Sequence, residues 1–199
     1  MKLIIKRILF YIVSFTWGGL MSIVGLLAML FTLPFGKFGI YHGRLYKRIG
    51  KNWGGVELGC FFLCDETAPE HTLAHECGHG LQNCLWGPLL PFVVCAPSAI
   101  RYWIFNQKDY ESKRNFSAIL SGVILSVGML TLLVFILTGN PWWLILPVVL
   151  VSYGLVIFYW LFYLELPKHQ EKPYPKYDDA WFEGQATNWG KTYVATDKI

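Results

Sequence analysis

The sequence predicts a mainly helical integral membrane protein with three transmembrane helices, one broken or re-entrant segment and a short β element. Hydrophobic residues make up 54% of the 199 residues and charged residues only 15%, whereas soluble domains contain about 25% charged residues. Several uncharged apolar stretches also reach the roughly 20 residues that a helix needs to cross a bilayer. The length predicts a single domain over residues 1–199.

The first predicted span is the uncharged stretch at about 8–35, which begins directly after Lys6 and Arg7. It is too long for the apolar region of a cleavable signal peptide, so we expect it to remain in the membrane. The second and third spans are expected at about 116–137 and 142–164. Because only a short Gly- and Pro-containing link separates them, they should form a tight helical hairpin.

The apolar stretch at 86–105 differs from the other spans because it contains three prolines and Arg101. Proline interrupts the helical hydrogen-bond ladder, and the freed backbone groups are costly in lipid. We therefore expect a broken, re-entrant or interfacial segment, with a full crossing as the alternative. If 86–105 does not cross, residues 36–115 and the tail from 165 lie on the same side of the membrane.

Basic residues predict which side of the membrane this is. Three of the 17 Lys and Arg residues precede the first span, and the other fourteen lie in the loop and tail regions on the opposite side. The positive-inside rule makes that side cytoplasmic.

The net charge of +4 is too small and too scattered to indicate a nucleic-acid partner. The odd number of cysteines, five, favours reduced thiols over a disulfide framework.

The stretch LAHECGHGLQ contains an H-E-x-x-H motif, in which His75 and His79 are four residues apart. Residues four apart share one face of a helix, so both imidazoles can bind one metal ion. Glu76 is rotated by about 100° from His75, which lets it reach a water molecule on that ion and take its proton. This spacing is typical of zinc metallopeptidases.

The helix that carries the motif is predicted from about Ala68 to Leu85, within a site segment at 56–85. Thr67-Ala68-Pro69-Glu70 matches a capping box, with Thr67 as the N-cap. Before it, Val56 to Leu63 is short and β-prone. This β element is either an edge strand beside the motif helix that holds a peptide by backbone hydrogen bonds or a strand packed beneath that helix.

A third ligand must come from elsewhere in the chain, because catalytic zinc commonly takes three protein ligands and the position six residues after His79 is a leucine. The site segment at 175–192 can supply it. It contains DDAWFEGQATNWG, which predicts a helix that Asp178 or Asp179 caps and Gly190 ends. On this helix Glu183 shares a face with small residues, which would permit close approach to another helix. A solvated amphipathic tail is the alternative.

The order of H-E-x-x-H, membrane hairpin and E-x-x-A resembles the membrane-embedded gluzincin metallopeptidases of the heat-shock HtpX and CAAX-prenyl endopeptidase kind. The stretch HECGHGLQ also looks like small bacterial membrane proteins with H-E-x-G-H-x-x-Q. The resemblance implies a zincin-like site in which His75, His79 and Glu183 bind Zn²⁺ and Glu76 is the general base. It also implies a peptidase of the bacterial cytoplasmic membrane that cleaves a polypeptide substrate at the cytoplasmic face.

The chain departs from that family pattern in two places. The family has an Asp after E-x-x-A, which orients a zinc-binding histidine, whereas this chain has Thr187. Thr187 or Asn188 would have to replace its hydrogen bond. In addition, one span is predicted before the motif, where the heat-shock relatives have two.

Several weaker candidates and alternative interpretations remain open at this point. His71 lies on the His75 stripe as a ligand, a gate or a solvated side chain, while Asp179, Tyr177 and His169 are candidates for supporting roles near the third ligand. Cys60 and Cys64 could join both histidines in a closed structural zinc site. The alternatives to a peptidase at the membrane face are a non-catalytic membrane protein with a structural or vestigial metal site and an intramembrane site-2-type protease.

Overall fold

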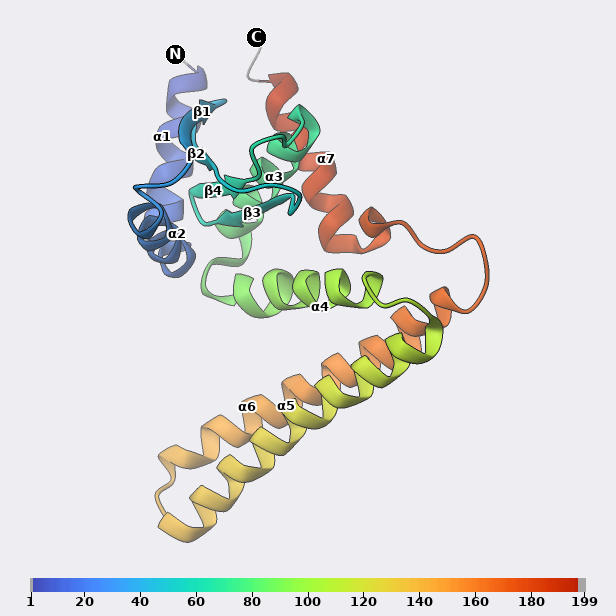
Figure 1. Cartoon of the computed structure of the whole chain (residues 1–199). Helices are drawn as coiled ribbons and strands as arrows, with labels where there is room; N and C mark the ends of the chain where they lie inside the picture. The colour runs from blue at the N-terminus through green and yellow to red at the C-terminus, as the bar shows by residue number, and fades with distance from the viewer. Residues whose placement is uncertain (1, 197–199) are drawn as a thin grey trace. The chain divides into compact units, whose positions relative to one another are not determined.

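A computed structural model describes residues 2–196, and within this range the chain is mainly helical with one small mixed sheet (Figure 1). The chain divides into two compact units: residues 99–177, and residues 1–98 together with 178–199. The helices are α1 (Lys2–Phe15), α2 (Gly19–Phe31), α3 (Glu70–Trp86), α4 (Ala96–Phe105), α5 (Tyr110–Thr138), α6 (Trp142–Tyr159) and α7 (Trp181–Thr196). The strands are β1 (Lys37–Tyr41), β2 (Arg44–Arg48), β3 (Gly55–Leu58) and β4 (Phe61–Cys64).

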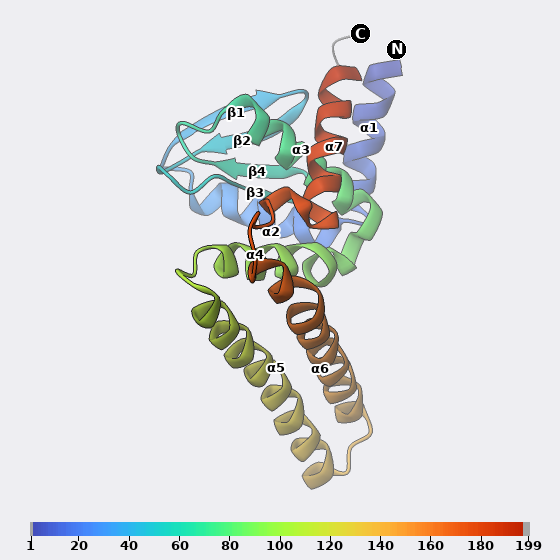
Figure 2. The same ribbon diagram turned by 90° about the vertical axis from the view of Figure 1, so that its right-hand side faces the viewer.

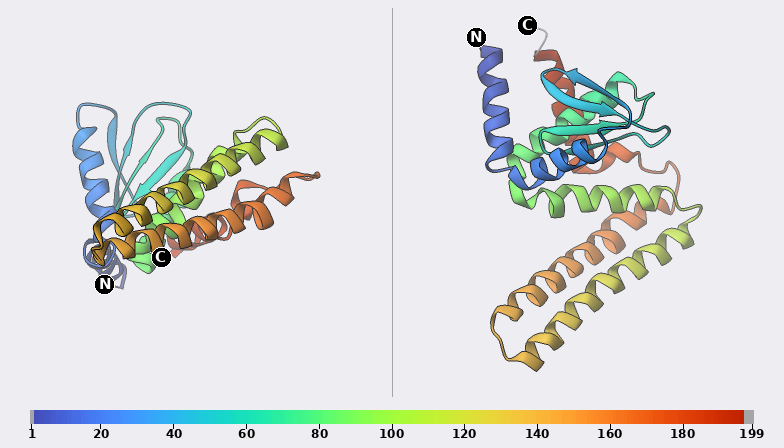
Figure 3. Two further views of the ribbon diagram at one scale, coloured as in Figure 1. Left: turned by 90° about the horizontal axis from the view of Figure 1, so that it is seen from below. Right: turned by 60° about the vertical axis from the view of Figure 1, so that its left-hand side comes forward.

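In the unit formed by residues 99–177, α5 and α6 form the predicted hairpin (Figure 3). Asp109 caps α5 by accepting a hydrogen bond from the Ser112 backbone N–H at 2.7 Å, and Gly139 ends the helix in the left-handed region. The helical run of α6 continues to His169, so both arms are long and apolar enough to cross a membrane. The second and third predicted spans are therefore confirmed as long apolar helices, and both extend beyond the predicted bounds.

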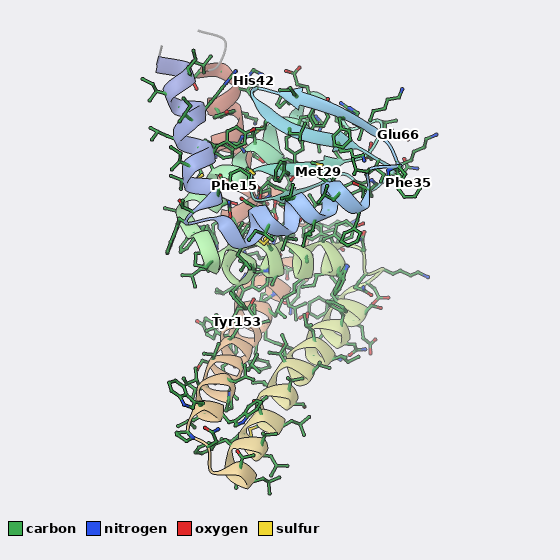
Figure 4. All side chains as sticks on the ribbon, turned by 90° about the vertical axis from the view of Figure 1, so that its left-hand side faces the viewer. Phe15, Met29, Phe35, His42, Glu66 and Tyr153 are labelled. Atoms are coloured by element: carbon green, nitrogen blue, oxygen red, sulfur yellow. The ribbon has the colours of Figure 1, made fainter. Side chains whose placement is uncertain are left out.

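The first predicted span is not one continuous helix, so the prediction is confirmed only as two apolar helices that are bent against each other. Residues 8–35 fall on α1 and α2, which bend by 94° around Thr16–Gly18 (Figure 4). Each arm, of 14 and 13 residues, is about 20 Å long, whereas the hydrocarbon core is about 30 Å thick. The Ser22 hydroxyl stabilises the bend by donating to the Ser14 carbonyl at 2.6 Å. The pair is thus a broken span or a re-entrant loop, and two to four segments are long and apolar enough to cross a membrane.

The stretch at 86–105 is broken, as its prolines predict. α3 ends at Trp86, a 3₁₀ turn covers Gly87–Leu89 and a π turn covers Pro91–Cys95 before α4 begins. Gly87 takes a positive φ of 51°, which ends α3. The break therefore lies where proline removes backbone donors.

The sheet has the strand order β1-β2-β4-β3, so β3 is an edge strand. β1 and β2 are antiparallel, β2 and β4 are parallel, and β3 and β4 are antiparallel. The predicted β element at 56–63 is in fact two strands, because Gly59 adopts a φ of 81° and turns the chain back on itself. β1 and β2 were not predicted at all.

α3 packs against β3 and β4, and a small apolar cluster that includes Phe62, Cys64, Leu73 and Cys77 joins it to β4. The predicted capping box is wrong. α3 begins at Glu70 with Pro69 as its N-cap and with no side-chain cap. The Thr67 hydroxyl and backbone N–H both donate instead to Asp65 Oδ1, at 2.9 and 2.7 Å. Asp65 therefore organises the turn before α3 in place of a cap.

α7 lies alongside α3 (Figure 2), and two glycines explain how closely the helices approach. A Cβ atom on Gly78 of α3 would lie 1.8 Å from the Ala186 carbonyl oxygen, and a Cβ atom on Gly190 of α7 would lie 1.9 Å from the Ala74 carbonyl oxygen. Only glycine fits at such positions. Gly190 thus lies inside α7, which continues to Thr196, and the prediction that Gly190 ends the helix is wrong.

Candidate metal centre

The structure brings together three of the predicted site residues, His75 and His79 on α3 and Glu183 on α7. The two Nε2 atoms lie 3.0 Å apart, and Glu183 Oε2 lies 3.2 Å from His75 Nε2 and 3.4 Å from His79 Nε2. Within the described range 2–196, this is the one group of three or more such side chains placed to hold a metal ion. The pairing of the H-E-x-x-H helix with the Glu183 helix is therefore a feature of the fold.

The glycine contacts between α3 and α7 account for this convergence. Ala186 and Gly190 are one and two turns beyond Glu183 on α7, and both press against the backbone of α3. Because the backbones approach so closely, the side chain of Glu183 reaches the histidine pair and is completely buried. The imidazoles remain partly accessible, with side-chain exposures of 19% for His75 and 12% for His79. The site is therefore open on the histidine side.

Each imidazole also has a partner on its other ring nitrogen. His79 Nδ1 lies 2.8 Å from Gln82 Oε1, and His75 Nδ1 lies 2.8 Å from Thr187 Oγ1. The Thr187 hydroxyl donates in turn to Asp178 Oδ2 at 3.2 Å. Thr187 stands where the resembled family has an Asp that orients a zinc-binding histidine. Here the Thr187 hydroxyl makes such a contact, to His75.

The electrostatics of the cluster favour a bound cation. Burial alone would raise the pKa of Glu183, but its contacts with His75 and His79 lower that pKa overall. Burial would lower the pKa of His79, but Glu183 and Glu76 together raise it to about 9. A buried carboxylate and two imidazoles therefore stabilise positive charge at their centre.

The donor set fits a metal ion. Among the described residues, neither carboxylate oxygen of Glu183 has a hydrogen-bond donor in good geometry, although both are buried. A buried carboxylate without such partners is costly. Two imidazole nitrogens and one carboxylate oxygen, open on one side, are a ligand set that Zn²⁺ accepts. A metal ion here would be held by His75, His79 and Glu183.

Glu76 lies beside this cluster, on the side of α3 that faces β3. Its side chain is buried and packs so closely on the strand that a Cβ on Gly55 would lie 2.5 Å from Oε1. Burial raises its pKa, while His79 and His75 lower it and the Glu57 backbone N–H contributes a hydrogen bond. Burial likewise raises the pKa of Glu57 to about 8. The carboxyl group predicted as the base is thus anchored to the edge strand.

The weaker candidates divide between the two units. His71 lines a cavity of about 350 Å³ with Tyr41, Glu70 and Lys191 and is not part of the metal cluster. Asn188 is exposed, and its backbone carbonyl accepts a hydrogen bond from the Thr192 hydroxyl at 2.9 Å. Asp179 ends a short 3₁₀ turn, and it is the neighbouring Asp178 that contacts Thr187.

The other two weak candidates, Tyr177 and His169, belong to the unit of residues 99–177. The Tyr177 carbonyl accepts a hydrogen bond from Arg101 Nε at 3.0 Å. His169 Nε2 lies 3.4 Å from Glu165 Oε1. Both therefore have structural partners inside that unit.

The cysteines of the alternative zinc site lie in the apolar core. Cys60 packs with Phe10, Met29 and Phe61, and Cys64 packs in the cluster beneath α3. Neither joins the group that could hold a metal among residues 2–196. The closed two-cysteine, two-histidine site is therefore not formed.

Gln82 was not among the predicted site residues, although it is completely buried beside the cluster. Its position three residues after His79, on the same helix, was the signal that could have identified it.

No family model, curated protein or solved structure matches this chain.

Proposed function

We propose that this chain is a membrane-bound, zinc-dependent peptidase that hydrolyses peptide bonds at the cytoplasmic face of a membrane. The observation that carries the proposal is the convergence of His75 Nε2, His79 Nε2 and Glu183 Oε2 within 3.4 Å of one another. The buried carboxyl group of Glu76, on the same helix, adds a base beside this group. These side chains provide a metal ligand set that is open on one side, together with a base.

In this proposal each side chain has a distinct task. His75, His79 and Glu183 hold Zn²⁺, which when bound supplies a Lewis acid that polarises a carbonyl group and acidifies water. Glu76 takes the proton from the attacking water and passes it to the leaving amine. Because burial raises the pKa of Glu76, its carboxylate is a stronger base than an exposed glutamate.

The substrate and the cellular side are part of the same proposal. The long apolar arms of α5 and α6 support association with a bilayer, and the distribution of Lys and Arg supports a cytoplasmic position for the site. A polypeptide, including a segment of another membrane protein, is the proposed substrate. An intramembrane site-2-type reaction is less well supported, because the third ligand, Glu183, lies on α7, outside the candidate spans.

A non-catalytic metal site is the second candidate, and one observation favours it. The Glu76 side chain is only 4% exposed and lies against β3, so its carboxylate also has a structural role. If that role is its only one, the metal ties α3 to α7 without turnover.

Zinc content and proteolysis of the protein in detergent test these two candidates together. We expect about one zinc per chain in the wild type and cleavage of a casein-like substrate, with zinc lost in His79→Ala and Glu183→Ala. Glu76→Gln should keep its zinc and lose cleavage. Glu70→Gln is the matched control, because Glu70 is an exposed glutamate on the same helix.

The possible outcomes separate the candidates. Full zinc in Glu183→Ala would exclude the site formed by two helices. Unchanged cleavage in Glu76→Gln would exclude the general-base role. Stoichiometric zinc in a wild-type protein that cleaves nothing would favour the non-catalytic site.

A further inference from the structure

We propose that Gln82 is a positioning residue that fixes the proton of His79 on Nδ1 and, through the same amide group, holds α7 in place beside α3. The proposal rests on the metal site proposed above, and it does not depend on peptidase activity. Gln82 is completely buried, and its side chain contacts His79 on its own helix and two residues of α7.

The orientation of the Gln82 amide follows from what its partners can accept. A backbone carbonyl is only an acceptor, so the atom 2.8 Å from the Phe182 carbonyl oxygen must be the Gln82 NH₂ group. The second hydrogen of that group reaches Gln185 Oε1 at 2.9 Å. The Gln82 carbonyl oxygen is therefore the atom that faces His79. The Phe182 carbonyl thus decides an amide orientation that would otherwise be ambiguous.

This orientation determines the tautomer of His79. An amide oxygen can only accept a hydrogen bond, so His79 Nδ1, 2.8 Å away, must carry a hydrogen. In the neutral ring the lone pair then lies on Nε2. Nε2 is the atom that faces His75 and Glu183. Gln82 therefore presents the metal-binding lone pair to the centre of the site.

The same group ties the third ligand to the motif helix. Phe182 and Gln185 flank Glu183 on the first turn and a half of α7, and both accept hydrogen bonds from one Gln82 side chain. Each buried hydrogen bond that loses one partner leaves a polar group unsatisfied. Orientation of His79 and docking of Glu183 are consequently coupled through a single amide.

His75 has a weaker counterpart of this arrangement. The Asp178 carboxylate can only accept, so the Thr187 hydroxyl donates to it and leaves a lone pair for His75 Nδ1–H. Both rings are thus directed towards the same tautomer. Asp178 is exposed, so water can replace it, whereas Gln82 is completely buried. We expect the Gln82 contact to have the larger effect on metal affinity.

Zinc affinity measured by competition with a chelator, on the full-length protein in detergent, tests the proposal. Partners of metal-binding histidines change metal affinity by about 10–100-fold, so we expect that loss in Gln82→Ala. Asn83→Ala is the matched control. Asn83 is the adjacent, equally buried amide, and it donates to the Gly18 carbonyl at 3.3 Å, away from the metal cluster. It should lower the thermal stability and leave zinc affinity within about threefold of wild type.

Gln82→Glu separates the two roles of the amide. A carboxylate still accepts from His79 Nδ1–H but cannot donate to Phe182 or Gln185. We expect zinc affinity closer to wild type than in Gln82→Ala, together with faster amide hydrogen exchange in the first turns of α7. Equal affinities of wild type and Gln82→Ala, or equal losses in Gln82→Ala and Asn83→Ala, would overturn the proposal.

The outcome for Gln82 can be read independently of the proposed activity. A wild-type protein that binds zinc but cleaves nothing would contradict the peptidase proposal, and the role of Gln82 in zinc binding could still be tested. Unchanged zinc affinity in Gln82→Ala would remove the positioning role and leave the peptidase proposal intact. A wild-type protein that binds no zinc would overturn both.

Discussion

Two glutamates, Glu183 and Glu165, are both buried beside histidines, yet their charges are compensated in different ways. Glu183 lies 3.2 and 3.4 Å from the Nε2 atoms of His75 and His79. Glu165 lies 3.4 Å from His169 Nε2, and it also pairs with the guanidinium group of Arg101, which is itself completely buried. One carboxylate has a permanent cation as its partner, whereas the basic groups paired with the other, within residues 2–196, are two imidazoles.

The two clusters differ in the way that a candidate metal site differs from a structural ion pair. An imidazole carries a positive charge only when it binds a proton, whereas a guanidinium group is always charged. Arg101 also donates to the carbonyl groups of Tyr177 and Lys176, at 3.0 and 2.6 Å, so the Glu165 cluster is satisfied by the chain itself. The charge of Glu183 can instead be compensated by a proton on an imidazole or by a metal ion, which this group could hold.

The largest expected effect is on metal binding by variants of the two glutamates. Glu183→Gln removes an anionic ligand, so zinc affinity should fall by more than the roughly 100-fold typical of outer contacts. Glu165→Gln is the matched substitution and should leave zinc affinity unchanged, because Glu165 is not part of the group that could hold a metal. Competition with a chelator measures both. A similar loss of zinc affinity in the two variants would contradict the proposed difference between the Glu183 and Glu165 clusters.

The next effect is on stability, in Arg101→Met. Breaking a buried ion pair by removing one partner costs about 3–5 kcal/mol, because it leaves a charge uncompensated. Thermal unfolding in detergent should therefore show a large decrease in Tm. The double variant Arg101→Met/Glu165→Gln should recover much of that stability. If the double variant is no more stable than Arg101→Met alone, the cost comes from lost packing and not from the unpaired carboxylate.

A smaller effect is expected from Gly78→Ala. The added Cβ would lie 1.8 Å from the Ala186 carbonyl oxygen, so α3 and α7 must move apart, at a cost of about 1–3 kcal/mol. Zinc affinity should fall as well, since Glu183 moves with α7. Gly122→Ala is the control, because a Cβ there meets no atom within 4 Å. Zinc affinity equal to wild type in Gly78→Ala would contradict the role given to close packing.

The smallest effect is expected from Lys168→Met. Lys168 Nζ lies 3.6 Å from Glu165 Oε2, but its side chain is 49% exposed. Ion pairs with such exposure contribute about 1 kcal/mol or less. The change in Tm should be far below that of Arg101→Met. A comparable decrease would show that Glu165 depends on both cations and not on the buried one alone.

The sequence predicted that His75, His79 and Glu183 would lie together better than it predicted the fold around them. The spacing of His75 and His79 determines their common face on any helix, and the small residues near Glu183 indicate close packing before any contact is known. The hairpin of α5 and α6 follows from its long uncharged stretches. These signals are local, so they can be read from short segments of the chain.

The errors came from features that depend on distant contacts. Thr67 matched a capping box, but Asp65 accepts its hydrogen bonds. Gly190 matched a helix end, but its missing side chain accommodates the Ala74 carbonyl. β1 and β2 went unpredicted because their residues pair across the sheet. The role of Gln82 also depends on contacts with α7, whose register on α3 no local pattern specifies.

The division of the metal cluster between α3 and α7 also sets an order of events during synthesis of the chain. The histidines are translated before the hairpin of α5 and α6, and Glu183 is translated after it. A ribosome that has made only the histidine helix has therefore made the candidate metal site without Glu183. The complete site, and any reactivity that belongs to it, can arise only after the hairpin has been made.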